Sequence, residues 1–392
     1  MKSLFYTILF ASFLFMATPT YAQSIHTITL ETGFKDQQRT LLIALPAGYE
    51  HSIDTFYEVI YVFDSQGTAY FDMVHASIDF LKPAGCGYIV VGVPSPHYSD
   101  DYHRFHDFLP ESRHAATKIK YGTGNAAGFL DFLEHRVFPV IQDRYRTAPN
   151  RIGVGHSNGG TFLTYALTTR TALFDAIIAI SPNYSFDEGQ ITDRIKAFDP
   201  SSIKEPKFIF ISSGIEDASN GWRAWEINRQ QVYAELRSAK WNKHIRFESS
   251  RFPAENHQST YPIAVVTAFS AYFTYQYKNF ENLVTHLNKL KNRDVKSIDA
   301  QKLNLFAYNL NLAGDARGAL QLLQWSNGLF PDDLKTYESL GDLHKYLKDS
   351  AKATDFYNLF ITKLEQQKEQ LASEEYTKHK VAVLTKIRAM HP

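Results

Sequence analysis

Five short, almost continuously apolar runs limit the possible fold of this chain more than any other feature. They are "EVIYVF" (58–63), "GYIVVGV" (87–93), "RIGVG" (151–155), "AIIAI" (176–180) and "KFIFISS" (207–213). Runs without polar alternation suit strands that are buried on both faces, as the strands of parallel sheets are. Because amphipathic helical patterns separate them, the sequence predicts an α/β fold with a mostly parallel sheet over residues 24–278.

One of these helical patterns, "AAGFLDFLEHRVFPVIQDRY" (126–145), contains a proline. Pro139 has no backbone N–H to donate, so we expect it to kink or split this helix.

The strand pattern ends near residue 279. Residues 309–333 and 343–367 read as helix pairs that overlay with an offset of 34, for example Asp315 on Asp349 and Ala319 on Ala353. This period is typical of tetratricopeptide repeats. We therefore expect a helical linker over 279–300 and a small all-α, tetratricopeptide-like domain over 301–392, with a plain helical hairpin as the alternative.

The N-terminus resembles an export signal. Lys2 precedes an apolar stretch over 4–16, and "TYA" (20–22) fits a small-residue cleavage site. The apolar run is shorter than the ~20 residues that a spanning helix needs. We expect residues 1–22 to be a signal peptide and the mature protein to be periplasmic or secreted, with no membrane span.

Charge and cysteine content exclude some functions. The 41 basic and 41 acidic residues balance, so bulk charge gives no reason to expect binding to nucleic acid or to an anionic membrane. Cys86 is the single cysteine. An exported chain with one cysteine has no internal disulfide, and we interpret Cys86 as a small buried residue.

The stretch "GHSNG" (155–159) fits the pattern G-x-S-x-G between an apolar strand and a helical pattern. That setting is what a nucleophile elbow requires, in which a sharp turn exposes a serine at the carboxyl edge of the sheet. Gly155 and Gly159 leave room for the turn, and Gly160 lets the helix approach the sheet. The pattern predicts Ser157 as the nucleophile.

A serine needs a base, which in this fold is a histidine late in the chain. Two histidines follow Ser157 within the α/β part. His244 begins a strand-like run, whereas His257 lies in the polar loop "PAENHQSTYP" after it. Because functional groups concentrate on loops held by rigid elements, we favour His257 and interpret His244 as structural.

The triad acid should follow the strand at 207–213, where Glu216 and Asp217 are adjacent. Its carboxylate would hold the imidazole tautomer and stabilise the imidazolium. The spacing from Gly214 favours Asp217, with Glu216 as the alternative. Trp222 and Trp225 come next and fit either an aromatic-binding cleft or packing on a helix face.

The oxyanion of the tetrahedral intermediate needs two backbone donors. One is the N–H of the residue after the nucleophile, Asn158, and the other follows the third strand of this fold. The candidate there is the N–H of Gln66 in "DSQG" (64–67).

Taken together, these segments resemble the Putative esterase family of α/β-hydrolases, which contains esterase D-like S-formylglutathione hydrolases, enterobactin-type siderophore esterases, feruloyl esterases and mycolyltransferases. The resemblance covers residues 27–277 and is strongest in "FLDFLEHRVFPVIQDRYRTAPNRIGVGHSNGG". It implies an α/β-hydrolase fold and hydrolysis of a small-molecule carboxylic ester through an acyl-enzyme, without a cofactor. Departures at His106 and at Ser65 concern substrate recognition more than the triad.

Other readings stay open at this point. The same triad would serve an acyltransferase or a peptidase. A non-catalytic hydrolase-fold scaffold could bind a protein partner through the helical repeats. The histidines and aspartates of 97–114 have no regular ligand spacing, so we expect no metal site there.

Overall fold

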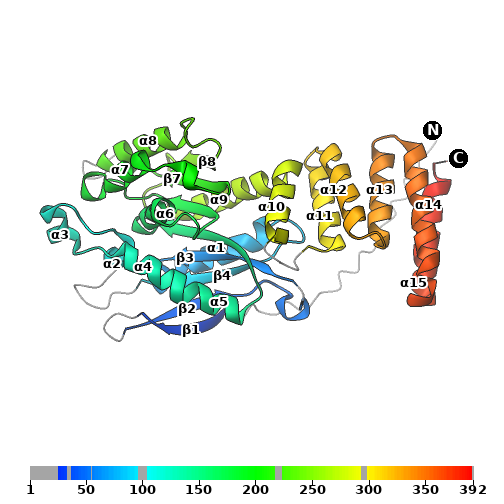
Figure 1. The fold of residues 1–392 in the computed structure, drawn as a ribbon, viewed down its shortest axis with the longest axis horizontal. Helices are drawn as coiled ribbons and strands as arrows, with labels where there is room; N and C mark the ends of the chain where they lie inside the picture. Colours follow the sequence, from blue (N-terminus) through cyan, green and yellow to red (C-terminus); the bar gives the residue numbers. More distant parts are fainter. Residues whose placement is uncertain are drawn as a thin grey trace, which may run out of the picture.

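The computed structural model describes residues 25–32, 37–53, 55–95, 104–216, 223–292 and 298–390. An eight-stranded sheet with the order β1-β2-β4-β3-β5-β6-β7-β8 forms its centre (Figure 1). β1 is antiparallel to β2, β2 is antiparallel to β4, and the neighbours from β4 to β8 are parallel. The strands are β1 (Ile25–Glu31), β2 (Gln38–Ala44), β3 (Tyr57–Phe63), β4 (Tyr88–Val93), β5 (Thr147–His156), β6 (Ala176–Ile180), β7 (Lys207–Ser213) and β8 (Ile245–Arg251).

The five apolar runs lie in β3 to β7, and every residue of β3, β4, β6 and β7 is buried. Alternate residues of each strand enter two separate cores, as Tyr61 and Val62 do on β3. Burial on both faces explains why these strands lack polar alternation. The predicted α/β-hydrolase fold is confirmed.

Helices cover both faces of the sheet. One face packs against α4 (Ala126–Phe132), α5 (Phe138–Arg144), α6 (Asn158–Thr169), α7 (Gln190–Ala197) and α8 (Arg223–Leu236). The other face packs against α1 (Ala69–Leu81) and α9 (Thr260–Tyr277). The short helices α2 (Arg104–Phe108) and α3 (Ala115–Tyr121) lie near the carboxyl edge of the sheet, toward the left of Figure 1.

The proline in the family-typical segment acts as expected. A π-helical turn, Leu133–Val137, separates α4 from α5, and Pro139 stands in the first turn of α5. A proline at this position has no N–H to donate to the preceding turn. The backbone hydrogen bonds there follow the wider π-helical pattern instead of the regular α-helical one.

The remaining helices are α10 (Phe280–Asn292), α11 (Ala300–Leu312), α12 (Ala316–Leu329), α13 (Leu334–Tyr346), α14 (Ser350–Gln366) and α15 (Ser373–Arg388). Four of them begin after an aspartate whose side chain accepts a backbone N–H of the first turn. These caps, Asp299, Asp315, Asp333 and Asp349, repeat with the offset of 34 that the sequence contains. Their assignment as tetratricopeptide-like repeats, and a role in binding a partner, stay predictions.

The segment expected to be a linker contains a helix that is part of the core. Leu283 and Leu287 of α10 are buried in the same apolar cluster as α9 and as Phe306 of α11. The apolar core that lies between the sheet and α9 therefore extends into the helical region. This region lies at the end of the molecule opposite α3 (Figure 1). Among the described residues, no helix combines the length and apolar character that crossing a bilayer requires.

Candidate active site

Ser157 stands between the last residue of β5 and the first residue of α6. Its φ of 57° and ψ of −121° are unfavourable for a side chain-bearing residue and fit a nucleophile elbow. Its backbone N–H donates to the carbonyl of Ile180 on the neighbouring strand at 2.8 Å. The structure thus supplies the strained strand-to-helix turn that the sequence pattern predicts.

The glycines around the serine differ in how strictly they are needed. A Cβ on Gly155 would lie 2.4 Å from the carbonyl carbon of Gly159, and one on Gly160 would lie 3.1 Å from the Gly155 oxygen. A Cβ on Gly159 would make an ordinary contact, at 3.5 Å from Asp64. The steric demand therefore falls on Gly155 and Gly160, whereas Gly159 matters through its backbone.

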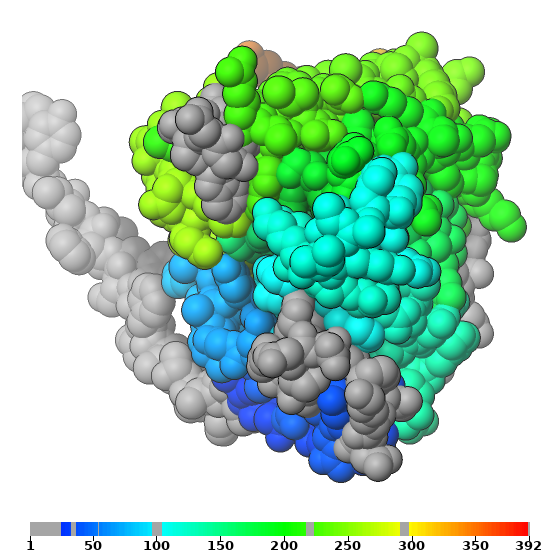
Figure 2. All heavy atoms as spheres, turned by 90° about the vertical axis from the view of Figure 1, so that its left-hand side faces the viewer, coloured from blue at the N-terminus to red at the C-terminus, as the bar shows by residue number. Residues whose placement is uncertain are grey.

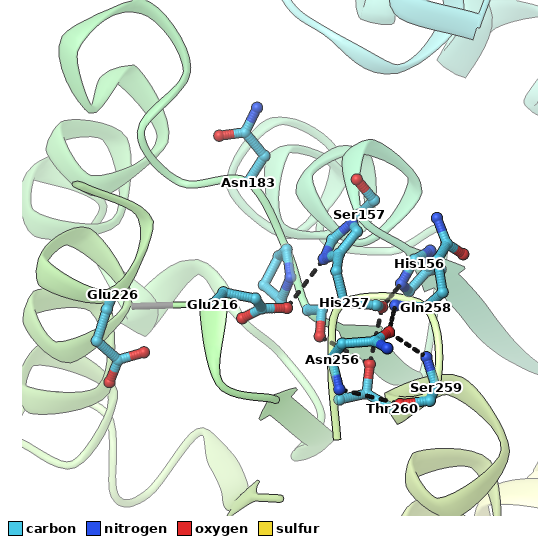
Figure 3. A network of polar contacts seen from close by, with 12 residues as sticks. His156, Ser157, Asn183, Glu216, Glu226, Asn256, His257, Gln258, Ser259 and Thr260 are labelled. Atoms are coloured by element: carbon cyan, nitrogen blue, oxygen red, sulfur yellow. Dashed lines mark hydrogen bonds and ion pairs between the residues drawn. The ribbon is translucent and has the colours of Figure 1, made fainter. Parts of the chain in front are cut away.

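His257 lies in the loop between β8 and α9, and its side chain is 16% exposed. Its Nδ1 is 2.9 Å from Oε1 of Glu216, which directly follows β7. In Figure 3 the imidazole lies between Glu216 and Ser157. Because a carboxylate only accepts, Nδ1 carries the proton, and Nε2 is left with a lone pair that can accept one.

The acid loop and the histidine loop approach each other through their backbones. The N–H of Ile215 donates to the carbonyl of Glu255 at 2.8 Å, and a Cβ on Gly214 would lie 2.4 Å from the same oxygen. Asp217, which the turn spacing favours, lies outside the described residues. Glu216, the alternative, holds the histidine.

A buried arginine supports Glu216 from behind. Nη2 of Arg229 on α8 is 2.7 Å from Oε2 of Glu216, and neither side chain is more than 1% exposed. Burial alone would raise the pKa of Glu216. The hydrogen bond from His257, the charge of Arg229 and a hydrogen bond from Ser181 outweigh burial and keep this pKa below its ordinary value. Glu216 is therefore ionised at neutral pH.

His156, next to the nucleophile, contacts the histidine loop, and sequence reasoning did not find this contact. Its Nε2 is 2.7 Å from the carbonyl oxygen of His257, and the two rings are 4.5 Å apart. Its Nδ1 is 3.1 Å from the hydroxyl of Tyr70 on α1. His156 is part of the G-H-S-N-G pattern in the sequence, but its partners, which are distant in sequence, are visible only in the structure.

Trp225 on α8 packs edge-on against His257, with ring centroids 5.3 Å apart and an interplanar angle of 84°. The sequence left two roles open for this tryptophan, lining an aromatic-binding cleft or packing on a helix face. The contact with His257 favours the first. Trp222 lies outside the described residues. His244 precedes the amino end of β8, at the far edge of the sheet from His257, in agreement with a structural role.

The candidate oxyanion donors flank the elbow. Asn158 is the first residue of α6, where backbone N–H groups have no partner within the helix. Gln66 lies in a short 3-10 turn that follows β3, and β3 is the neighbour of β5 in the sheet. Its side chain binds Asp64 and the backbone N–H of Ser95. The roles of the Asn158 and Gln66 N–H groups stay predictions.

The segment before α4 lies across the carboxyl edge and is held by two ion pairs, one buried and one partly buried. Figure 2 faces this edge and shows α2 and α3, in cyan, beside the yellow-green residues that follow β8. Asp107 is 2.9 Å from Arg39 of β2, and Arg104 forms two hydrogen bonds with Asp64, at 2.9 and 2.6 Å. Within the described ranges no group of three potential metal ligands occurs; residues 96–103 are not among them.

Comparison with known proteins places the α/β part of the chain among esterases. The model of the Putative esterase family matches residues 34–259, more than half of the chain. The siderophore triacetylfusarinine C esterase of Aspergillus fumigatus is 36% identical over 119 residues, which are 29% of this chain and 39% of that protein. The ferri-bacillibactin esterase BesA of Bacillus subtilis is 29% identical over 148 residues, 37% of this chain and 50% of that protein. Each match thus spans half or less of the relative.

Among solved structures, an IroE-like serine hydrolase from Shewanella oneidensis superposes with a TM-score of 0.57 at 20% identity. The superposition covers 86% of this chain and 99% of that one. At this identity the likeness concerns the fold. The superposed part of the chain is longer than the sheet domain and therefore includes part of the helical region.

Proposed function

Because the chain belongs to the Putative esterase family, we propose that it is an exported serine esterase that hydrolyses carboxylic esters through an acyl-enzyme. The observation that carries the proposal is the hydrogen bond between His257 Nδ1 and Glu216, beside a serine in a strained elbow. An imidazole held in this way presents its unprotonated Nε2 as a general base.

In the proposed reaction, the Ser157 hydroxyl attacks the ester carbonyl carbon while His257 takes its proton. The oxyanion is stabilised by the N–H groups of Asn158 and Gln66 and by the N-terminus of α6. The tetrahedral intermediate collapses, and His257 returns the proton to the leaving alcohol. Water then repeats the sequence and releases the acid. Glu216, assisted by Arg229, stabilises the imidazolium of His257.

The substrate class we propose is a small-molecule siderophore ester. Both curated relatives carry siderophore esterase names, which supports this class over other esters. Trp225 beside His257 provides an apolar wall where the leaving alcohol receives its proton. We also propose that residues 1–22 direct export, which would bring the enzyme to the periplasm or to the medium.

The test is hydrolysis of short p-nitrophenyl esters, followed by a panel of siderophore, aryl and sugar esters. Wild type should hydrolyse them and be labelled by a fluorophosphonate on one serine. Ser157→Ala should lose both properties, whereas Ser77→Ala, on α1, should keep both. Equal hydrolysis by wild type and Ser157→Ala would contradict the proposal. Transfer of the acyl group to added alcohol or amine acceptors would favour an acyltransferase.

A further inference from the structure

His156 joins the nucleophile strand to the loop that carries the base. The residue is 2% exposed, and its ring contacts the Tyr70 ring, stacked at 5.4 Å, and the His257 ring at 4.5 Å. The Tyr261 ring meets it edge-on at 5.8 Å. Three elements therefore close around one imidazole: α1, the histidine loop and α9.

The hydrogen bonds of His156 determine its tautomer. The carbonyl oxygen of His257 can only accept, so Nε2 of His156 carries the proton. Nδ1 then has a lone pair that faces the Tyr70 hydroxyl at 3.1 Å, and the single proton of that hydroxyl is shared between Nδ1 and Oε1 of Gln258, which is 3.2 Å away. Burial, and next to it the charge of His257, lower the pKa of His156 to about 4. The ring is neutral wherever a histidine base works, and both of its nitrogens are bound.

These contacts leave His156 no lone pair or proton for the ester, but they act on the base. Glu216 fixes the rotation of the His257 imidazole, whereas the hydrogen bonds of the loop, among them those accepted by the His257 carbonyl, set the position of its backbone. That carbonyl accepts from His156 at 2.7 Å and from Thr260 Oγ1 at 3.0 Å. His156 is the donor that belongs to the nucleophile strand, so it sets the loop relative to Ser157.

We propose that His156, oriented by Tyr70, is a positioning residue that sets the distance between the His257 imidazole and Ser157 by holding the His257 carbonyl. This inference rests on the proposed esterase function, because it assigns a role in the same site. A displacement of the base by about 1 Å can cost on the order of 100-fold in rate.

The test compares His156→Leu with His156→Gln, whose amide nitrogen can replace Nε2 as the donor. His156→Leu should lower kcat for p-nitrophenyl ester hydrolysis by about 10- to 100-fold with KM nearly unchanged. His156→Gln should recover most of the loss, and Tyr70→Phe should show a smaller decrease. His75→Leu, which changes a partly buried histidine on α1, is the matched control and should retain wild-type kcat. A folded His156→Leu with wild-type kcat would overturn the proposal.

A second measurement does not depend on activity. In protein with 15N-labelled histidine, the Nδ1 proton of His257 should give a hydrogen-bonded resonance in wild type and in Ser157→Ala. The resonance should persist in His156→Gln and broaden or shift in His156→Leu. An unchanged resonance in His156→Leu would overturn the positioning role. Absence of ester hydrolysis by wild type, with this NMR pattern intact, would instead overturn the proposed function and support the positioning role.

Discussion

The sheet has a glutamate–histidine pair at each end, with both glutamates buried, and the two pairs have different surroundings. At the carboxyl edge, Glu216 and His257 are 2.9 Å apart. At the amino edge, Glu58 near the start of β3 is 2.8 Å from His286 of α10. Residue types and distances are alike, so the pair itself does not make an active site.

The two pairs use different ring nitrogens and different neighbours. His286 faces its carboxylate with Nε2, and Tyr277, Tyr272 and Asn150 surround the same carboxylate with hydrogen bonds. Its Nδ1 is buried and has no hydrogen-bond partner in the described part of the chain. His257 instead binds with Nδ1 and has Ser157 beside it. A catalytic pair needs the carboxylate on Nδ1, so that Nε2 can take a proton, and it needs a nucleophile, a position that Ser157 in the elbow after β5 can fill.

The position in the sheet explains this division of roles. In parallel sheets the loops at the carboxyl ends of the strands form the ligand site, while the amino ends serve stability. The Glu58–His286 pair connects β3 to α10 and thus to the helical region.

The largest expected difference is between the two histidines. His257→Asn should lower kcat/KM for ester hydrolysis by about 10⁴-fold or more, because the base is lost. His286→Asn should change it by less than about threefold, because its ring lies at the opposite edge of the sheet. Steady-state kinetics on one p-nitrophenyl ester compares them. A comparable loss in both variants would show that the contrast is wrong.

The next largest difference is between the two adjacent carboxylates. Glu216→Gln should lower kcat by about 10³- to 10⁴-fold, since the amide cannot stabilise the imidazolium. Asp217→Asn, the matched control one residue later, should stay near wild type. The reverse outcome would assign the acid to Asp217 and restore the preference that the turn spacing gave.

Stability should respond at the other pair. His286→Leu leaves the buried Glu58 carboxylate without the ring nitrogen that lies 2.8 Å from it, and we expect a loss of about 3 kcal/mol in the free energy of unfolding. Urea unfolding measures it, and Ser157→Ala provides the comparison because it should unfold as wild type does. If the unfolding midpoint of His286→Leu matched wild type, the pair would not stabilise the junction.

Arg229 allows a smaller and more specific test. Arg229→Met removes the charge that helps to lower the pKa of Glu216, so this pKa should rise. The acid limb of the kcat/KM profile should move to higher pH, with a decrease in kcat of about 10-fold. Arg229→Lys should restore part of the profile. An acid limb at the same pH as in wild type would show that Arg229 does not support the triad through Glu216.

The smallest effect concerns acid stability. Burial alone would raise the pKa of Glu58, but the charge of His286 and hydrogen bonds from His286, Asn150 and Tyr277 outweigh burial and lower it. Because the folded-state pKa lies below the unfolded one, Glu58 stabilises the fold above the unfolded pKa of about 4.3. This contribution is lost as pH falls through the folded value. Melting temperatures from pH 7 to 3 should therefore fall less steeply in Glu58→Gln than in wild type, and equal slopes would contradict the linkage.

Much of the candidate site follows from local sequence. The alternation of apolar runs and helical patterns predicts the sheet, since burial on both faces requires it. The spacing of Gly155, Ser157 and Gly160 predicts the elbow, because its sterics involve neighbouring residues. The order of motifs along the chain places His257 in the loop after the last strand.

Tertiary structure decided what depends on the direction of side chains and on contacts distant in sequence. Glu216 and Asp217 are adjacent in the sequence, and the hydrogen bond from the Ile215 N–H to the Glu255 carbonyl is part of what brings Glu216 to the histidine. His156 binds a carbonyl 101 positions away in sequence, and α10, expected as a linker, lies in the core through Leu283. Local sequence determines which chemical groups are available, but long-range packing determines which of them meet.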